Sequence, residues 1–170
     1  MTPPTLTKPA LINHLSMCGF KAFGDRYLTV QGATTPGGVT VDLVAISVTQ
    51  PPAVHATIAA TTYSEALASM DKLVKIINEK VANAVWLAIP FEVSEALGGF
   101  KRIEKAGIGL IVVKAQSSFG LGSAEVLVEV LPKVEARKQP WPDLQSKLKE
   151  KGKPELALEL EKTLGKKPSF

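Results

Sequence analysis

The sequence predicts an α/β fold, a mixed β-sheet flanked by helices, with a helical hairpin at its C-terminal end. Segments with a helical spacing of apolar residues alternate along the chain with short β-branched segments, which is the order of a mixed sheet with crossover helices. Two segments, 84–89 and 107–113, are apolar almost throughout, as strands buried on both faces are. The 170 residues, 45% of them hydrophobic, are enough for one core and too few for two ordinary ones.

The first half of the chain predicts one helix and three strands. Residues 9–19 begin with Pro9, which suits a first helical turn, and end with Gly19, which suits a C-terminal stop. Strands rich in β-branched residues are expected at 27–31, 39–47 and 54–60. A Pro-Pro pair turns the chain between the last two strands, which therefore form an antiparallel hairpin centred near 50–51.

The second half predicts alternating helices and strands. Thr62 and Glu65 form a capping-box pattern that opens a helix ending near residue 81. Further strands are expected at 84–89, 107–113 and 125–131, and further helices at 92–106 (broken at its two glycines), 143–151 and 154–164. Residues 140–142 mark a boundary between an α/β domain, 1–138, and a helical appendage, 139–170, packed on or extending from the same domain.

Composition excludes several classes of protein. No apolar run approaches the roughly 20 residues that a membrane-spanning helix needs, and residues 1–9 do not have the pattern of a signal peptide. One cysteine excludes an internal disulfide framework, and two histidines are too few for a His-rich metal site. Three Asn and five Gln beside twelve prolines suit a heat-adapted protein of the cytoplasm.

The positive charge is concentrated at the C-terminal end. Residues 1–130 contain ten Lys/Arg and ten Asp/Glu, whereas residues 131–170 contain ten Lys/Arg and six Asp/Glu. The whole net charge of +4 therefore lies in the tail. Such a tail can contact a phosphate backbone, but a solvated, lysine-rich helical face is the interpretation that we favour.

Three short segments carry a resemblance to a known fold family. Residues 41–45 are VDLVA, with Asp42 in an apolar strand, residues 85–90 are VWLAIP and follow a helix, and residues 107–110 are GIGL. In this order and spacing they resemble the PD-(D/E)XK nuclease-like superfamily, which includes many restriction enzymes and archaeal Holliday-junction resolvases. The resemblance covers residues 8–115 and implies a restriction-endonuclease-like core.

The resemblance implies metal-assisted phosphodiester hydrolysis, in which two carboxylates hold Mg²⁺ and a lysine positions the attacking water. Asp42 matches the first carboxylate of the family. The family's Glu-x-Lys belongs on the next strand, and reflection about the hairpin centre puts it at residues 59–61, which are Ala-Ala-Thr. Residues 9–19 contain no acid either. The sequence thus predicts a nuclease fold that has lost catalysis and uses no cofactor.

One alternative keeps an active site. Some members of the superfamily carry the missing acid on the following helix, which corresponds here to Glu65, with Lys72 two turns further along the same face. A catalytic site of Asp42, Glu65 and Lys72 would then bind Mg²⁺ through Asp42. We favour the simpler interpretation, in which Glu65 completes the capping box and Lys72 is solvated.

Basic residues in two of the predicted helices are the candidates for nucleic-acid binding. They are Lys72, Lys75, Lys101, Arg102 and Lys105. Their cationic groups suit DNA or RNA phosphates, although Glu92, Glu95 and Glu104 interleave with them and offer local neutralisation.

The sequence therefore predicts a catalytically degenerate nuclease-fold protein that acts as a nucleic-acid-binding or structural/regulatory subunit. Two alternatives stay open: an active Mg²⁺-dependent nuclease with the relocated site, and a protein-interaction module without a nucleic-acid role. A homodimer is also expected, because the superfamily often dimerises and because the apolar faces of the tail helices offer a surface.

The other chemistry-bearing residues have structural interpretations. His55 has no identifiable acid–base partner and is interpreted as a surface or strand-pairing histidine, and His14 as an exposed residue of the first helix. Cys18 is interpreted as a small core filler and Trp86 as a core residue. Trp141 either pins the tail helices onto the sheet or anchors a partner. The glycine-containing loops 32–38 and 117–122 match no nucleotide-binding pattern.

Overall fold

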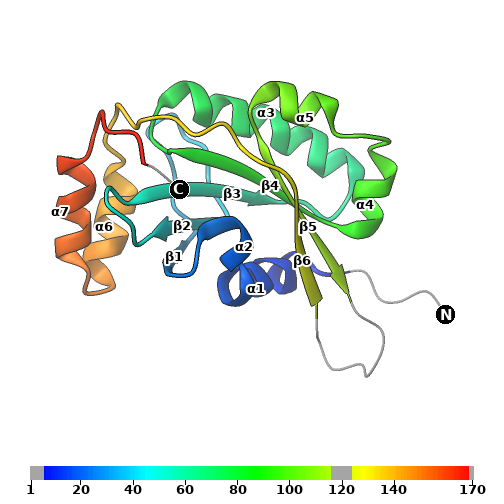
Figure 1. Ribbon diagram of the computed structural model, residues 1–170, viewed down its shortest axis with the longest axis horizontal. Helices are drawn as coiled ribbons and strands as arrows, with labels where there is room; N and C mark the ends of the chain where they lie inside the picture. The colour runs from blue at the N-terminus through cyan, green and yellow to red at the C-terminus, as the bar shows by residue number, and fades with distance from the viewer. Residues whose placement is uncertain (1–5, 116–123, 169–170) are drawn as a thin grey trace.

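The computed structural model describes residues 6–115 and 124–168, which form a six-stranded mixed sheet with helices on both faces (Figure 1). The strands are β1 Tyr27–Gln31, β2 Leu43–Ser47, β3 Ala53–Ala59, β4 Ala84–Pro90, β5 Gly109–Ala115 and β6 Ala124–Val130. Their order across the sheet is their order in the chain. Neighbours are antiparallel from β1 to β3, parallel from β3 to β5, and antiparallel between β5 and β6. The predicted α/β class with a mixed sheet is confirmed.

Two layers of helices cover the sheet. The helices are α1 Lys8–Cys18, α2 Phe20–Phe23, α3 Tyr63–Glu79, α4 Phe91–Ala96, α5 Lys101–Ala106, α6 Pro142–Glu150 and α7 Pro154–Lys162. In Figure 1, α1 and α2 lie on one face, α3, α4 and α5 lie on the other, and the α6–α7 pair lies at the β1 end. No helix in the described ranges is long and apolar enough to cross a membrane. The predicted glycine loop 117–122 lies outside the described residues.

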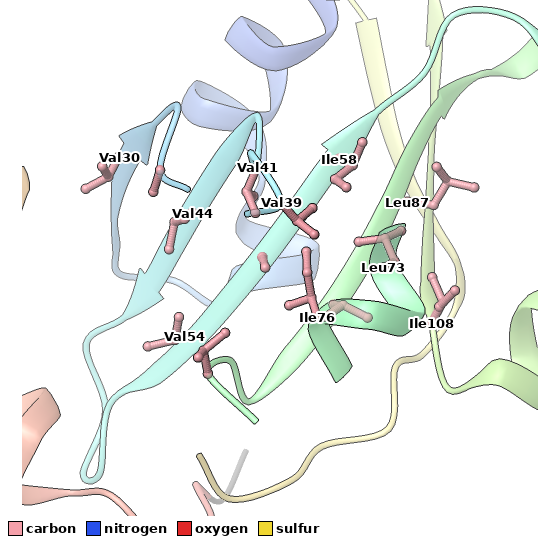
Figure 2. Close-up of a cluster of buried hydrophobic side chains, with 14 of the residues drawn as sticks. Val30, Val39, Val41, Val44, Val54, Ile58, Leu73, Ile76, Leu87 and Ile108 are labelled. Carbon is pink, nitrogen blue, oxygen red and sulfur yellow. The ribbon is translucent and has the colours of Figure 1, made fainter. Parts of the chain in front are cut away.

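The strand pleat divides the apolar side chains between two cores. Val44 and Ile58 belong to the same cluster as Leu73 and Ile76 of α3, and this cluster is the larger one (Figure 2). The alternate residues of the same strands face the other way, where α1 covers them with side chains such as Leu11. Because successive residues of a strand point to opposite faces, fully apolar strands supply both cores.

Strand β2 is shorter than the sequence predicts. The expected strand 39–47 begins only at Leu43, and the residues before it belong to a separate loop in which Thr35 and Val39 pair through a backbone hydrogen bond. Glu79 holds this loop, because its carboxylate accepts from the Gly37 N–H at 2.5 Å and from the Thr35 hydroxyl at 2.7 Å. The anchor lies 42 residues away along the chain, so local β-propensity does not reveal it.

The β2–β3 hairpin is displaced slightly from its predicted centre. Leu43 pairs with Thr57, which places the centre at residue 50 rather than between 50 and 51. Strand pairing ends at Leu43, so Asp42 stands just before the strand and is not the sheet partner of Ala59. This small shift decides which side chains surround Asp42.

The C-terminal helices belong to the larger core. Trp141 is 1% exposed, and its Nε1 donates to the Thr34 carbonyl at 2.9 Å, while Asp143 accepts from the Thr34 N–H at 2.7 Å. The buried Arg137 guanidinium donates to the Leu160 carbonyl at 2.9 Å, and its burial lowers the pKa of Arg137 to about 10. Of the two roles expected for Trp141, the structure thus shows the anchor for the tail, because the side chain is buried by its own chain.

Several apolar side chains of the tail helices are covered by their own chain. They are at most 1% exposed: Leu144, Leu148, Ala157 and Leu160. They pack in the same cluster as the sheet. Leu158 of α7 remains 50% exposed, and a homodimer stays a prediction.

Candidate functional site

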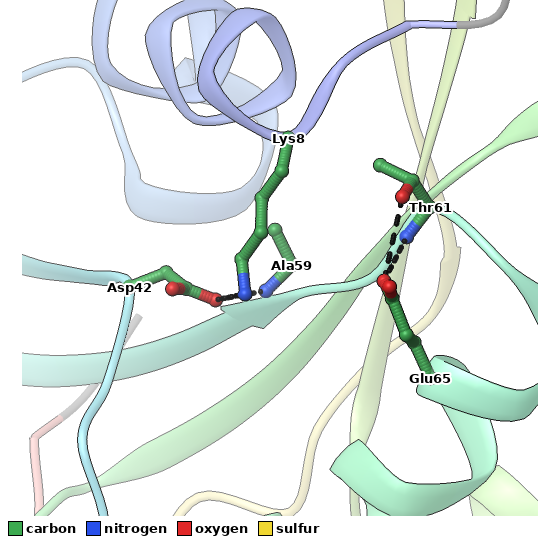
Figure 3. A network of polar contacts seen from close by, with 5 residues as sticks. All are labelled: Lys8, Asp42, Ala59, Thr61 and Glu65. Carbon is green, nitrogen blue, oxygen red and sulfur yellow. Dashed lines mark hydrogen bonds and ion pairs between the residues drawn. The ribbon is translucent and has the colours of Figure 1, made fainter.

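Asp42 lies at the edge of the sheet where β3 ends and α1 begins (Figure 3). Its Oδ2 accepts a hydrogen bond from the Ala59 N–H at 2.8 Å and lies 3.3 Å from the Lys8 ammonium. Lys8 is the first residue of α1, which Thr7 caps by accepting from the Ala10 N–H. The predicted proximity of Asp42 and Ala59 is therefore present, through a side-chain contact rather than strand pairing.

The surroundings of Asp42 supply one carboxylate and one ammonium. The two side chains are 19% and 45% exposed respectively, so water partly screens their attraction. Position 59, where the resemblance implies an acid, carries a methyl group that packs in the α1-side core. A Mg²⁺ ion is usually held by one or two carboxylates together with water and phosphate, and here Lys8 already supplies a positive charge to the carboxylate. These residues do not fit a Mg²⁺ site.

Glu65 points away from Asp42, toward the start of its own helix (Figure 3). Its Oε2 accepts from the Thr61 N–H at 3.1 Å and from the Thr61 hydroxyl at 3.3 Å. The Thr62 hydroxyl in turn accepts from the Glu65 N–H at 3.2 Å. The exchange resembles a capping box, with the carboxylate reaching one residue further back than usual.

The relocated site of Asp42, Glu65 and Lys72 is not assembled. Lys72 is exposed on α3, and no hydrogen bond or ion pair joins it to either acid. Within the ranges 6–115 and 124–168, no group of three or more His, Cys, Asp or Glu side chains is arranged to hold a metal ion. The geometry thus agrees with the capping interpretation of Glu65.

The candidate nucleic-acid-binding side chains are all exposed and lie on two helices of one face. Lys72 and Lys75 belong to α3, and Lys101, Arg102 and Lys105 belong to α5. None of them forms an ion pair with another described residue. The acids that interleave with them, Glu92, Glu95 and Glu104, are exposed too. The face therefore carries free cations within a mixed-charge surface.

The structure also shows a buried polar chain that sequence reasoning missed. His55 is 1% exposed, so its interpretation as a surface residue is wrong, whereas it does pair within the sheet, with Ala45 and Ala84. The Trp86 indole N–H donates to His55 Nδ1 at 3.0 Å, and His55 Nε2 lies 2.8 Å from Ser47 Oγ. The Ser47 hydroxyl donates to the Phe23 carbonyl at 2.5 Å. Serine and histidine at this distance also occur in hydrolytic sites.

The direction of the hydrogen bonds excludes general-base chemistry by His55. Because Trp86 donates to Nδ1, that nitrogen carries no proton, and the neutral ring must carry its proton on Nε2. His55 then donates to Ser47, whereas a general base must accept the serine proton. Burial lowers the pKa of His55 to about 4, so the ring is neutral at pH 7. The chain connects β2, β3, β4 and α2 as a structural element.

Sequence gives a signal for the burial of His55 but not for its partners. The histidine interrupts the apolar run 53–60, which suits a buried strand. Its partners, Trp86 and Ser47, come from two other strands, and the pleat and register that bring them together are properties of the assembled sheet.

Two residues of the first helical segment differ from expectation in exposure. Cys18 is exposed and does not fill the core. Gly19 follows it and is buried, and the Phe23 ring packs so close that a Cβ on Gly19 would lie 2.7 Å from it. Phe23, not Cys18, is the residue of this segment that belongs to the α1-side core. His14 is partly exposed.

Comparison with known proteins informs the fold and not the site. No model of a known protein family matches the sequence, and no protein of curated function matches it. Among solved structures, the chain is similar to the SPO1766 protein of unknown function from Silicibacter pomeroyi, with a TM-score of 0.50 and 14% identity over 97% of both chains. At this identity the similarity concerns the architecture alone.

Proposed function

We propose that this protein is a non-catalytic nucleic-acid-binding protein built on a scaffold that resembles the PD-(D/E)XK nucleases. The observation that carries the proposal is the pairing of Asp42 with Lys8 at 3.3 Å. The ammonium lies next to the carboxylate that a catalytic metal would need, and the second acid is replaced by Ala59. The residues described around Asp42 therefore include no group that would activate a water molecule for hydrolysis.

The arrangement of the elements supports the scaffold. A helix, three antiparallel strands, a helix and a parallel strand follow one another as α1, β1–β3, α3 and β4. The helices α1 and α3 lie on opposite faces of the sheet (Figure 1), and Asp42 directly precedes the second strand. This is the arrangement that the resemblance implies.

The exposed cations of α3 and α5 support nucleic acid as the ligand. Five basic side chains without an ion-pair partner among the described residues are free to contact phosphates. Each contact with duplex DNA changes the slope of log affinity against log salt by about −0.9. If all five take part, the expected slope is about −4.5.

Fluorescence anisotropy with labelled single-stranded and duplex DNA and RNA, over a series of salt concentrations, tests the proposal. Reversing the charge of Lys101, Arg102 and Lys105 to Glu should weaken binding of every sequence and reduce the magnitude of the slope to about 2. Reversing Lys162, Lys166 and Lys167 at the end of the chain changes the net charge equally and is the matched control.

Three outcomes would contradict the proposal. Absence of binding at low salt for all four nucleic acids would favour a protein-interaction module. Loss of affinity only in the tail variant would place the contact surface elsewhere. Cleavage of any substrate with Mg²⁺ or Mn²⁺ that Asp42→Ala abolishes would establish the active nuclease alternative.

A further inference from the structure

A hollow on the α1–α2 face lies at the end of β2 that is opposite to Asp42. It has a volume of about 720 Å³, and we call it the apolar groove. Its lining includes Phe20 and Phe23 of α2, Val48 after β2, Trp86 of β4, and Leu131 after β6. We propose that the apolar groove binds a small amphipathic anion, namely an aliphatic or aromatic body that carries one carboxylate.

The rim of the apolar groove exposes large apolar side chains to water. Phe20 is 53% exposed, Val48 57% and Leu131 78%, and all three line the hollow. An exposed apolar side chain alone is ordinary, whereas several around one concave surface indicate a binding site. A ligand body lying between them would remove their apolar area from water, which is the main favourable contribution to such binding.

The charges at the rim select the sign of the ligand. Lys21 and Arg26 line the hollow, are exposed, and form no ion pair with a described residue. Asp25 is the one acid among the described lining residues, so the rim carries a net positive charge. The carboxylate would lie beside Lys21 and Arg26 in water, with charge-assisted hydrogen bonds to them.

The floor of the apolar groove explains why the charged group stays at the rim. Trp86, His55 and Ser47 contribute to the floor and are hydrogen-bonded to one another. The floor is therefore uncharged at pH 7, and an ion buried against it would lose its hydration without a counter-charge. The ligand body enters, and the anionic end remains outside.

The volume favours a small molecule over a second copy of the chain. Hollows of about 300–1,000 Å³ with apolar walls and few polar groups are the usual form of small-molecule sites. Decanoate, decan-1-ol and decylammonium have the same apolar body and differ in charge, and they are used below the micelle concentration of the two ions and below the aqueous solubility of the alcohol. Isothermal titration calorimetry of the full chain with these three probes measures whether the apolar body binds and whether a negative charge on it is preferred.

We expect decanoate to bind more tightly than decan-1-ol, and decylammonium to bind most weakly. Leu131→Asn should weaken decanoate binding by about tenfold, whereas Leu158→Asn, which removes a 50% exposed leucine on α7, should leave it unchanged. Combining Lys21→Glu with Arg26→Glu should remove the preference for decanoate over decan-1-ol while retaining decan-1-ol binding. Since these positions are exposed, the variants should fold, and circular dichroism checks that.

The proposal is overturned by any of four results: no binding of the three probes, equal affinity for all three, an equal effect of Leu131→Asn and Leu158→Asn, or a dimer in sedimentation that Leu131→Asn dissociates. The last result would mean that the apolar groove is an interface between copies. None of these measurements involves α3, α5 or Asp42, so the outcome is independent of nucleic-acid binding.

Discussion

His55 makes the stability of this protein depend on pH in a way that one substitution tests. Its ring is 1% exposed, and burial lowers its pKa from 6.5 to about 4. In the unfolded chain the pKa returns to about 6.5. At a pH between these two pKa values, the unfolded state binds more protons than the folded state. The stability that comes from keeping the ring neutral is therefore complete above pH 6.5 and is lost as the pH falls toward 4.

The expected loss follows from the difference between the two pKa values. Each pH unit between them corresponds to about 1.4 kcal/mol, so the full change is about 3 kcal/mol. His55→Gln keeps hydrogen-bonding capacity at this position but does not titrate. Urea unfolding between pH 7.5 and 4, followed by circular dichroism, should show that the wild type loses about 3 kcal/mol more than this variant over the same range.

The comparison isolates His55, because the carboxylates titrate in both proteins and cancel in the difference. His14→Gln removes the other histidine and leaves the buried chain of hydrogen bonds intact, so it is the matched control. Parallel pH curves for the wild type and His55→Gln would refute the reasoning. A nitrogen NMR spectrum with the proton on Nδ1 at pH 7 would refute the assignment that Trp86 donates to that atom.

Substitutions at three further residues test individual polar contacts by urea unfolding. Asp42→Ala should cost about 1–2 kcal/mol because the Ala59 N–H loses its acceptor, and Asp42→Asn, which keeps an oxygen, should cost less. Arg137→Met should cost about 3 kcal/mol, because the Leu160 carbonyl and other buried partners lose their donor. Trp141→Phe should cost about 1 kcal/mol through the lost hydrogen bond to its carbonyl partner.

The control for Arg137 is its exposed cationic neighbour, Lys138. Lys138→Met changes the charge beside Arg137 at an exposed position and should alter stability by less than about 0.5 kcal/mol. Equal effects of Lys138→Met and Arg137→Met would contradict the buried role of the guanidinium. An Asp42→Asn variant as unstable as Asp42→Ala would mean that the charge, rather than the acceptor oxygen, matters at this position.

Local patterns were sufficient for most of the secondary structure. The strand at 27–31 and the helix that Thr62 caps follow from residue preferences within a few positions, and both agree with the structure. The predicted secondary structure is wrong where a side chain from a distant part of the sequence determines the local conformation. Residues 39–42 have high β-propensity, yet they belong to a loop that Glu79 anchors from the end of α3. The four-residue helix α2 is too short for its periodicity to stand out.

In the candidate site, too, some features could be predicted from neighbouring residues in the sequence, whereas others depend on residues far apart in the chain. The missing acid on β3 follows from the sequence, because the hairpin turn is short and its register is nearly fixed. Lys8 was not identified as the partner of Asp42, because α1 reaches this edge only once it packs across the sheet. The hydrogen bonds of His55 likewise depend on three strands and their pleat, which no single segment specifies.

The charge balance at Asp42 provides a last prediction. Lys8 supplies one positive charge, which is enough for one carboxylate. Ala59→Glu would add a second carboxylate at a position that is 2% exposed, and like charges that share one ammonium are unfavourable. The variant should lose about 2–4 kcal/mol of stability in the absence of divalent ions, and Mg²⁺ should restore part of it by binding the folded state.

Thermal unfolding of Ala59→Glu and of the uncharged Ala59→Gln, each with and without Mg²⁺, separates charge from size. The melting temperature of Ala59→Glu should rise with Mg²⁺, whereas Ala59→Gln and the wild type should not respond. A wild type stabilised by Mg²⁺ would mean that a cation already binds Asp42 in competition with Lys8. In that case the non-catalytic interpretation would fail at the residue pair on which it depends.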